Sequence, residues 1–298
     1  MRSLLEMMKK TLLITVIAAV ALMALIGIGE RFWPGNKRIV AAAPKPSAEP
    51  IQTLRVCADP NNLPYSNQRM EGFENKLAEL VANDLNAKLE YTWWAQRKNF
   101  IRNSLDAGKC DLVLGLPSSI QTVSTTRPYY RSSYVFIYRK DAPFKINSLD
   151  DGILKNLRIG IHVVDAGYAP PAQLLAQRGI VDNIVGYSLF GDPSEPNPPA
   201  RLIDAVARKQ IDVAIAWGPL AGYFATHQSV PMQVIPIPLA EGDKNPPLIY
   251  DISMATRKND KALESKIDSI LQKRHEDVEK ILHDFGVPEL PKETQKTE

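Results

Sequence analysis

The chain has 298 residues, of which 45% are hydrophobic and 23% are charged. This composition is typical of a globular protein large enough for two domains, and it excludes a disordered or a membrane-filling chain. The formal net charge is +3, but the first 50 residues carry 7 Lys/Arg and 3 Asp/Glu, which leaves 29 basic and 30 acidic residues in the rest. Without a dense basic face, this body is not expected to bind nucleic acid.

The N-terminal segment, residues 1–29, is predicted to be an export signal. Lys9 and Lys10 precede an uncharged apolar run over residues 11–29. These 19 residues are long enough to cross a bilayer, whereas the core of a cleaved signal peptide has about 7 to 15. A removed signal peptide and a retained anchor that tethers the protein to the inner membrane therefore both stay open. Residues 30–52 are small, charged and Pro-rich, which predicts a tether.

The first half of the folded body is predicted to be a β-α-β-α-β unit. Short apolar runs that end at turn residues are typical of strands buried in a parallel sheet, and apolar stripes at helical spacing separate them. Right-handed crossovers bring the loops of such a unit to one edge of the sheet. The predicted strands are 54–59, 89–94 and 110–115, and the predicted helices are 74–85 and 97–107.

The second half repeats this pattern. Its predicted strands are 157–164, 183–187 and 211–217, and its predicted helices are 171–177 and 200–209. Residues 134–139 leave the first unit, residues 250–257 return to it, and 261–285 form one long striped helix. Two antiparallel crossing segments are typical of a hinge.

The predicted fold class is therefore α/β, with two lobes that each hold a mixed, mostly parallel sheet flanked by helices. We assign residues 53–138 plus 250–290 to lobe 1, residues 139–249 to lobe 2 and residues 291–298 to a polar tail. Between Tyr187 and Ala200 lies SLFGDPSEPNPP, whose four prolines exclude a helix or a central strand. It is either a tolerated surface insertion or a loop that contacts a partner.

Several long blocks, in order, resemble the type II periplasmic binding proteins of solute-binding family 3. They are CADPNNLPYSN, GFENKLAELVA, YTWW, GKCDLVLGLP, TTRPYYRSSYVFIYR and DVAIAWGPLAGYFA, and the resemblance covers residues 53 to 288. Within this group the blocks are most similar to the branch encoded beside quinoprotein dehydrogenases, the J proteins of methanol-oxidation clusters (MxaJ/XoxJ type).

The resemblance implies a non-catalytic periplasmic protein without a cofactor of its own. Its implied role is to assist maturation or activation of a PQQ-dependent methanol or alcohol dehydrogenase, by engaging the incomplete apo enzyme in its cleft. The alternative is the substrate-binding component of an ABC transporter for a small solute that is not a standard α-amino acid.

The residues by which amino-acid-binding members of this fold hold their ligand are missing. In those members an Arg after the third strand clamps the ligand carboxylate with two parallel hydrogen bonds, but Val123 occupies roughly that place here. The acidic residue that meets the ligand ammonium is also absent, because Trp217 is followed by Gly218 and Pro219. An α-amino acid would enter such a cleft with both charges unpaired, at a cost of several kcal/mol.

Polar and aromatic side chains remain where the strands of both units end, and they predict a cleft for a neutral ligand or a protein segment. For the loop that begins at Asp59, turn chemistry is an alternative, and for His162 a structural hydrogen bond is equally open. The candidate cleft residues are Asp59, Asn61, Asn62, Tyr65, Ser118, Ser119, Tyr129, Tyr130, His162, Asp165, Tyr168 and Trp217.

Cys57 and Cys110 are the only cysteines of this exported chain, and disulfides persist outside the cytoplasm. They fall on strands expected to be neighbours. Because Cys110 begins its predicted strand and Cys57 lies well along its own, their Cα atoms reach bonding distance only if the register is staggered. A disulfide is favoured, with two buried thiols as the alternative.

No motif in the body predicts catalysis. GxSxG, HExxH and a Walker loop are absent, and the four histidines are scattered without the spacing of metal ligands. Glu74 is interpreted as a first-turn acid that favours the helix dipole, rather than as a catalytic acid or base.

Overall fold

The computed structural model describes residues 50–164, 167–191, 195–238 and 246–290, except for the side chain of Tyr168. They belong to one compact unit, Glu49–Glu298. The predicted export signal, most of the tether (30–49) and the polar tail lie outside the described residues. Within the described residues, no helix is both long and apolar enough to span a bilayer.

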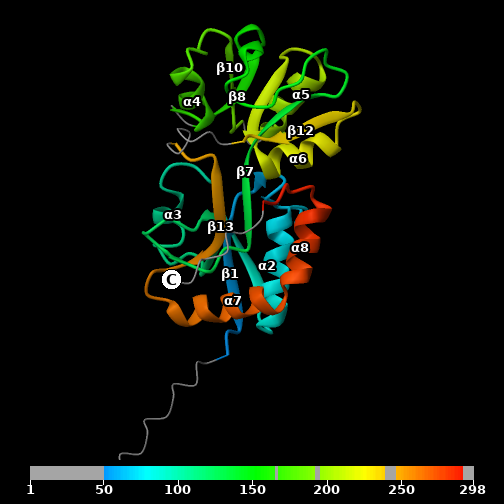
Figure 1. Ribbon diagram of the computed structural model, residues 1–298. Coiled ribbons are helices and arrows are strands. Elements are labelled where there is room, and N and C mark those ends of the chain that lie inside the picture. Colours follow the sequence, from blue (N-terminus) through cyan, green and yellow to red (C-terminus); the bar gives the residue numbers. More distant parts are fainter. Residues whose placement is uncertain (1–49, 165–166, 192–194, 239–245, 291–298) are drawn as a thin grey trace, which may run out of the picture. The chain divides into compact units, whose positions relative to one another are not determined.

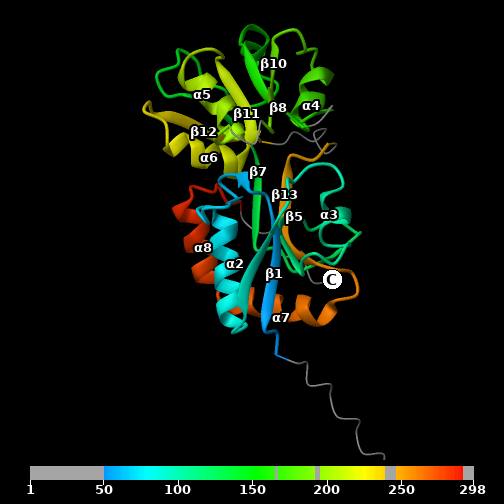
Figure 2. The ribbon, with the colours of Figure 1, turned by 180° about the vertical axis from the view of Figure 1, so that it is seen from behind.

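The described strands of this unit, except for one short hairpin, form one mixed sheet (Figures 1 and 2). Its main path runs β10-β8-β11-β7-β13-β5-β1-β4, and β12, β6 and β9 pair with β7, β13 and β8 respectively. The strands of the main path are β1 (Thr53–Ala58), β4 (Lys88–Trp93), β5 (Leu112–Pro117), β7 (Tyr130–Arg139), β8 (Ile159–Val164), β10 (Ile184–Ser188), β11 (Val213–Trp217) and β13 (Ile249–Thr256). The short strands are β6 (Ser124–Thr125), β9 (Gly167–Tyr168) and β12 (Met232–Pro236), and β2 (Asn61–Asn62) with β3 (Ser66–Asn67) forms a separate hairpin.

Helices flank this sheet, which confirms the predicted α/β class. In both views α2 and α8 lie on one side of β1 and α3 lies on the other (Figures 1 and 2). The α-helices are α2 (Phe73–Asp84), α3 (Phe100–Asn103), α4 (Pro171–Gln177), α5 (Arg201–Ala207), α6 (Gly218–Thr226), α7 (Lys261–Lys273) and α8 (His275–Asp284). The described residues also form two 3-10 helices, Gly152–Asn156 and Pro198–Ala200.

β1 lies inside the sheet because it buries side chains on both faces. It pairs in parallel with β4 and β5. Leu54 and Val56 join the apolar cluster that contains Leu77 of α2, whereas Cys57, which points the other way, joins the cluster of Phe100 on α3. The period of two along a strand therefore distributes one apolar run between two cores.

β7 and β13 are the two crossing segments that the sequence predicts. The first residues of β7, Tyr130–Ser133, pair antiparallel with β13, and its later residues pair with β11 and β12. One apolar cluster surrounds β1, α2, α7 and α8, and another surrounds β8, β11 and α5. We call these the first and second lobe; the exact lobe limits and a hinge motion at the crossing stay predictions.

The predicted helix 97–107 is wrong, because only Phe100–Asn103 is α-helical. Asn99 before it has a left-handed backbone, with φ of 65°, and successive turns follow it. They end where the N–H of Lys109 donates to the carbonyl of Ser104 at 3.0 Å. These turns bring Cys110 back over β1, and β5 starts two residues later, at Leu112 rather than at 110.

The predicted single helix 261–285 is also wrong. It breaks at Arg274 into α7 and α8. A straight helix of that length would extend for roughly 37 Å. The break lets apolar residues of both parts, among them Ile267 and Leu282, join the cluster of Leu77 on α2.

Candidate functional site between the lobes

The loop after β1 is held by the carboxylate of Asp59. Its Oδ1 accepts a hydrogen bond from the N–H of Asn61 at 2.9 Å, and its Oδ2 accepts one from the N–H of Gln96 at 2.6 Å. The hydroxyl of Ser66 donates to the Asp59 carbonyl at 2.8 Å. Asp59 thus performs the turn chemistry that the sequence left open, and it also joins this loop to the segment after β4.

A cavity of about 460 Å³ lies beside this loop. Its opposite wall is the Pro-rich loop of the second lobe, in its described parts Leu189–Gly191 and Glu195–Pro198. The side-chain amide of Asn61 donates to the carbonyl of Glu195 at 2.8 Å. Lining residues are Asp59, Pro60, Asn61, Asn62, Asn67, Gln68, Arg69, Ala95, Arg97, Leu189, Phe190, Gly191, Glu195, Pro196, Asn197 and Pro198.

Arg97 forms the second contact across the cavity. Its Nη2 donates to the carbonyl of Gly191 at 3.4 Å, and its guanidinium carbon lies 5.2 Å from the ring centroid of Phe190. Both described parts of the Pro-rich loop therefore contact the first lobe. Of the predicted cleft residues, the cavity brings together Asp59, Asn61 and Asn62.

Arg97, Phe190 and Glu195 were missed by the sequence analysis. Arg97 fell within the predicted helix 97–107, where it carried no signal of a binding site. The contacts of Phe190 and Glu195 join positions roughly 90 to 130 residues apart, which no local pattern reports. The four prolines of their loop were the only signal, because they exclude regular structure there.

Aromatic rings pack where the two lobes meet. Trp217, at the end of β11, has its ring 5.5 Å from Tyr134 on β7 and 5.7 Å from Tyr250 on β13. Tyr130 on β7 is buried and lies 6.2 Å from Phe73, which in turn lies 5.4 Å from Tyr65. The predicted residues Tyr65, Tyr130 and Trp217 thus belong to an aromatic junction and do not line the cavity.

Three further candidates lie on the first lobe, outside the cavity lining. The hydroxyl of Ser118 contacts the hydroxyl of Ser253 at 2.6 Å and the carbonyl of Asp251 at 3.0 Å, so it joins β5 to β13. Ser119 is exposed. Tyr129 is buried, and its ring centroid lies 5.0 Å from that of Tyr130.

His162 lies on β8 of the second lobe and is 5% exposed. Its Nε2 is 3.3 Å from the carbonyl of Pro199, at the end of the Pro-rich loop. Burial lowers the pKa of His162 to about 4, so the imidazole is neutral at physiological pH and fills a structural position. The neighbouring candidates Asp165 and the side chain of Tyr168 lie outside the described residues.

We expect His162 to make the protein acid-sensitive. Between pH 6.5 and 4 the unfolded chain binds a proton at this imidazole and the native state does not, so stability is lost as the pH falls through that window. The loss by pH 4 should be about 3 kcal/mol relative to His162→Gln. Urea unfolding at pH 7.5 and pH 4 measures it, with exposed His275→Gln as the control; equal acid sensitivity of wild type and His162→Gln would contradict it.

The position at which amino-acid-binding members of this fold carry the carboxylate-binding Arg holds an uncharged residue in this protein. Val123 is 6% exposed and packs in the apolar cluster of Cys57 and Phe100. The next arginine, Arg127, is exposed and turns toward α7, where its Nε lies 2.7 Å from Asp268. Neither Val123 nor Arg127 therefore offers a free cation to a ligand carboxylate.

Glu74 lies in the first turn of α2, as interpreted from the sequence, but its side chain is buried, 8% exposed. One of its carboxyl oxygens lies against Gly115, where an added Cβ would approach it within 2.1 Å. Burial, together with the negative charge of Asp59, raises the pKa of Glu74 to about 8. The carboxyl is thus neutral at pH 7 beneath the loop that borders the cavity.

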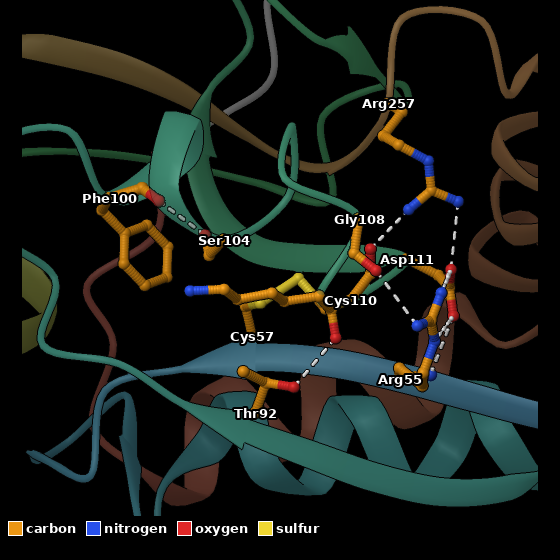
Figure 3. The surroundings of a disulfide bond; sticks show 10 residues. Arg55, Cys57, Thr92, Phe100, Ser104, Gly108, Cys110, Asp111 and Arg257 are labelled. Atoms are coloured by element: carbon orange, nitrogen blue, oxygen red, sulfur yellow. Dashed lines mark hydrogen bonds and ion pairs between the residues drawn. A yellow bond between two sulfur atoms is a disulfide. The ribbon is translucent and has the colours of Figure 1, made fainter.

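The disulfide between Cys57 and Cys110 is confirmed, with a Cα separation of 5.6 Å (Figure 3). The stagger that it needs comes from the turns before β5, which carry Cys110 over the face of β1. Beside it, Asp111 pairs with Arg55 at 2.6 Å and with Arg257 at 3.0 Å (Figure 3). Among the described residues, no group of three His, Cys, Asp or Glu side chains is placed to hold a metal ion.

Residues 54–286 match the family model of the bacterial extracellular solute-binding proteins, family 3. The chain belongs to this family. Within it, the protein is similar to MoxJ of Methylorubrum extorquens, with 34% identity over 263 residues that cover 84% of this chain and 85% of MoxJ.

Two solved structures show the same similarity of this family 3 protein to J-type binding proteins. The periplasmic binding protein XoxJ from Methylobacterium extorquens AM1 is 37% identical, with a TM-score of 0.67, over 80% of this chain and 100% of XoxJ. MxaJ from Methlophaga aminisulfidivorans MPT is 27% identical, with a TM-score of 0.69, over 80% of this chain and 100% of MxaJ. The resemblance stated from the sequence, including its MxaJ/XoxJ-type branch, is confirmed.

Proposed function

We propose that this family 3 protein is a non-catalytic periplasmic binding protein that assists maturation or activation of a PQQ-dependent methanol or alcohol dehydrogenase. Its ligand in this role is the apo form of the dehydrogenase, a segment of which enters the cavity between the lobes. The similarity to MoxJ and XoxJ over most of the chain supports this proposal.

The observation that carries the proposal is the chemistry of the lobe junction. The rings of Tyr134 and Tyr250 both pack on Trp217 there, and the clamp position holds buried Val123. Neither Trp217 nor Val123 offers the opposite charge that an amino acid needs at these two positions. The polar cavity lies farther out, between loops of the two lobes, where side-chain amides such as those of Asn61 and Asn62 can bind the backbone of a protein segment.

Binding to the dehydrogenase in its apo and PQQ-loaded forms tests this proposal. We expect the mature chain to bind the apo form at least about tenfold more tightly, a difference of roughly 1.4 kcal/mol, and to raise the rate at which the apo enzyme becomes active. The PQQ-loaded enzyme is the control. Absence of binding to the apo enzyme, measured before any PQQ is added, contradicts the proposal.

Transport of a small solute is the second candidate, and one observation favours it. The cavity volume of about 460 Å³ lies within the range of small-molecule sites, about 300 to 1,000 Å³. A thermal-shift screen separates the two functions, because a ligand that binds only the folded state raises the melting temperature progressively with its concentration. Saturable stabilisation by one solute, without binding of the apo dehydrogenase, would assign the cavity to transport.

A further inference from the structure

Four exposed cations without an acidic partner lie close together in the sequence after β4. Arg97, Lys98, Arg102 and Lys109 are exposed, and within the described part of the chain none of them forms a salt bridge, whereas Arg55 and Arg158, for example, each pair with an aspartate. The stretch 94–109 contains a single acidic residue, Asp106. It is therefore locally basic although the folded body has a net charge of about −1.

Aromatic rings hold two of these cations. The Nζ of Lys109 lies 4.0 Å from the ring centroid of Trp94, and Arg97 lies over Phe190 as described above. A cation on an aromatic face keeps its charge available to an incoming anion, and its side chain loses less freedom when that anion binds. Trp94 itself is 38% exposed, one of the few large apolar side chains on the surface.

The start of this stretch lies at the cavity, because Ala95 and Arg97 are among the lining residues. The N–H of Trp94 donates to the carbonyl of Ala58 at 2.9 Å, and the next residues are joined to Asp59 through Gln96. Arg97 lines the cavity itself. The hydroxyl of Thr92 donates to the carbonyl of Lys109 at 2.9 Å, which fixes the backbone of that turn against β4. We name Trp94, Arg97, Lys98 and Lys109 the basic rim.

We infer that the basic rim is a docking surface for an acidic segment of the protein that occupies the cavity. This inference rests on the proposed function, because it names the chemistry of the partner surface at the same site. Of the three cations of the basic rim, only Arg97 lines the cavity. A small solute held in the cavity would therefore not contact Lys98 or Lys109. A protein segment that continues past the cavity places its carboxylates over all three, and charge complementarity of this kind raises the rate of association.

Charge reversal of the basic rim tests the inference. The rim variant is Arg97→Glu, Lys98→Glu, Lys109→Glu, and the matched control is Lys145→Glu, Lys155→Glu, Arg208→Glu, three exposed cations outside the rim with the same change in net charge. We expect the association rate constant for the apo dehydrogenase at low salt to fall at least about tenfold in the rim variant and less than about threefold in the control. The dependence of that rate on salt should also weaken in the rim variant alone.

Each outcome decides the inference. If the wild type does not bind the apo dehydrogenase, both the proposed function and the docking role of the basic rim are wrong. If the rim variant and the control associate with the apo dehydrogenase at equal rates, only the docking role of the basic rim is wrong. Vesicles of phosphatidylglycerol and phosphatidylethanolamine are the second probe: if the rim variant loses only vesicle binding, the rim faces a membrane and the inference is wrong. The milder variant Arg97→Gln, Lys98→Gln, Lys109→Gln removes the three charges without reversing them. It should keep the melting temperature of the wild type and associate with the apo dehydrogenase at an intermediate rate, which separates loss of charge from misfolding.

Discussion

Removal of the disulfide by Cys57→Ala with Cys110→Ala is expected to lower the free energy of unfolding by about 4 kcal/mol. The bond joins residues 53 apart in sequence, and in the chain-entropy model a cross-link over that distance stabilises by constraining the unfolded chain. Both cysteines are buried, at 2% and 0% exposure, so lost packing adds to this. Urea unfolding of the wild type and the double variant measures the loss.

Reduction separates the cross-link from the packing. The wild type in dithiothreitol should lose most of the same stability, and the double variant should be insensitive to the reductant. Two reactive thiols in the denatured, unreduced wild-type protein would contradict the disulfide itself.

Glu74→Gln is expected to stabilise the protein above pH 7. The pKa of this carboxyl is raised from 4.5 to about 8 in the native state. Between these values the native state keeps a proton that the unfolded chain releases, so stability falls as the pH rises through the window. By pH 8 the free energy of unfolding of the wild type should therefore have fallen by about 4 kcal/mol. The variant cannot ionise at this position and should not show this loss.

Urea unfolding at pH 5 and pH 8 measures this difference. Glu79→Gln is the matched control, because Glu79 lies on the same helix but forms a solvent-accessible salt bridge with Lys76, and surface pairs contribute about 0 to 1 kcal/mol. If Glu74→Gln is no more stable than the wild type at pH 8, the conclusion that the native Glu74 carboxyl is buried and neutral is wrong.

Only part of the predicted cleft lines the cavity. Asp59, Asn61 and Asn62 were predicted at the cleft because they follow a buried strand, and the loops after such strands meet at one edge of a sheet. They do line the cavity. Tyr130 and Trp217 are also predicted at the cleft edge, but each packs against other rings instead, Tyr130 against Phe73 and Trp217 against Tyr134 and Tyr250, which removes their apolar area from water.

The two wrong helices have one physical origin. The apolar periodicity over 97–107 and over 261–285 was read correctly as a buried stripe, but helix ends depend on contacts outside the segment. The first is cut short at Asn103 by the turns that bring Cys110 to Cys57, and the second breaks at Arg274 so that both parts cover α2.

The sequence by itself determined the α/β class, the two repeated units, the crossing strands and the family, because hydrophobic periodicity and ordered motifs are local properties of the chain. Only the tertiary structure decided the burial of Glu74, the aromatic junction and the meeting of Arg97 with Phe190. These depend on distances between residues far apart in the chain, which are set when the sheet and its loops pack, and no local pattern encodes them.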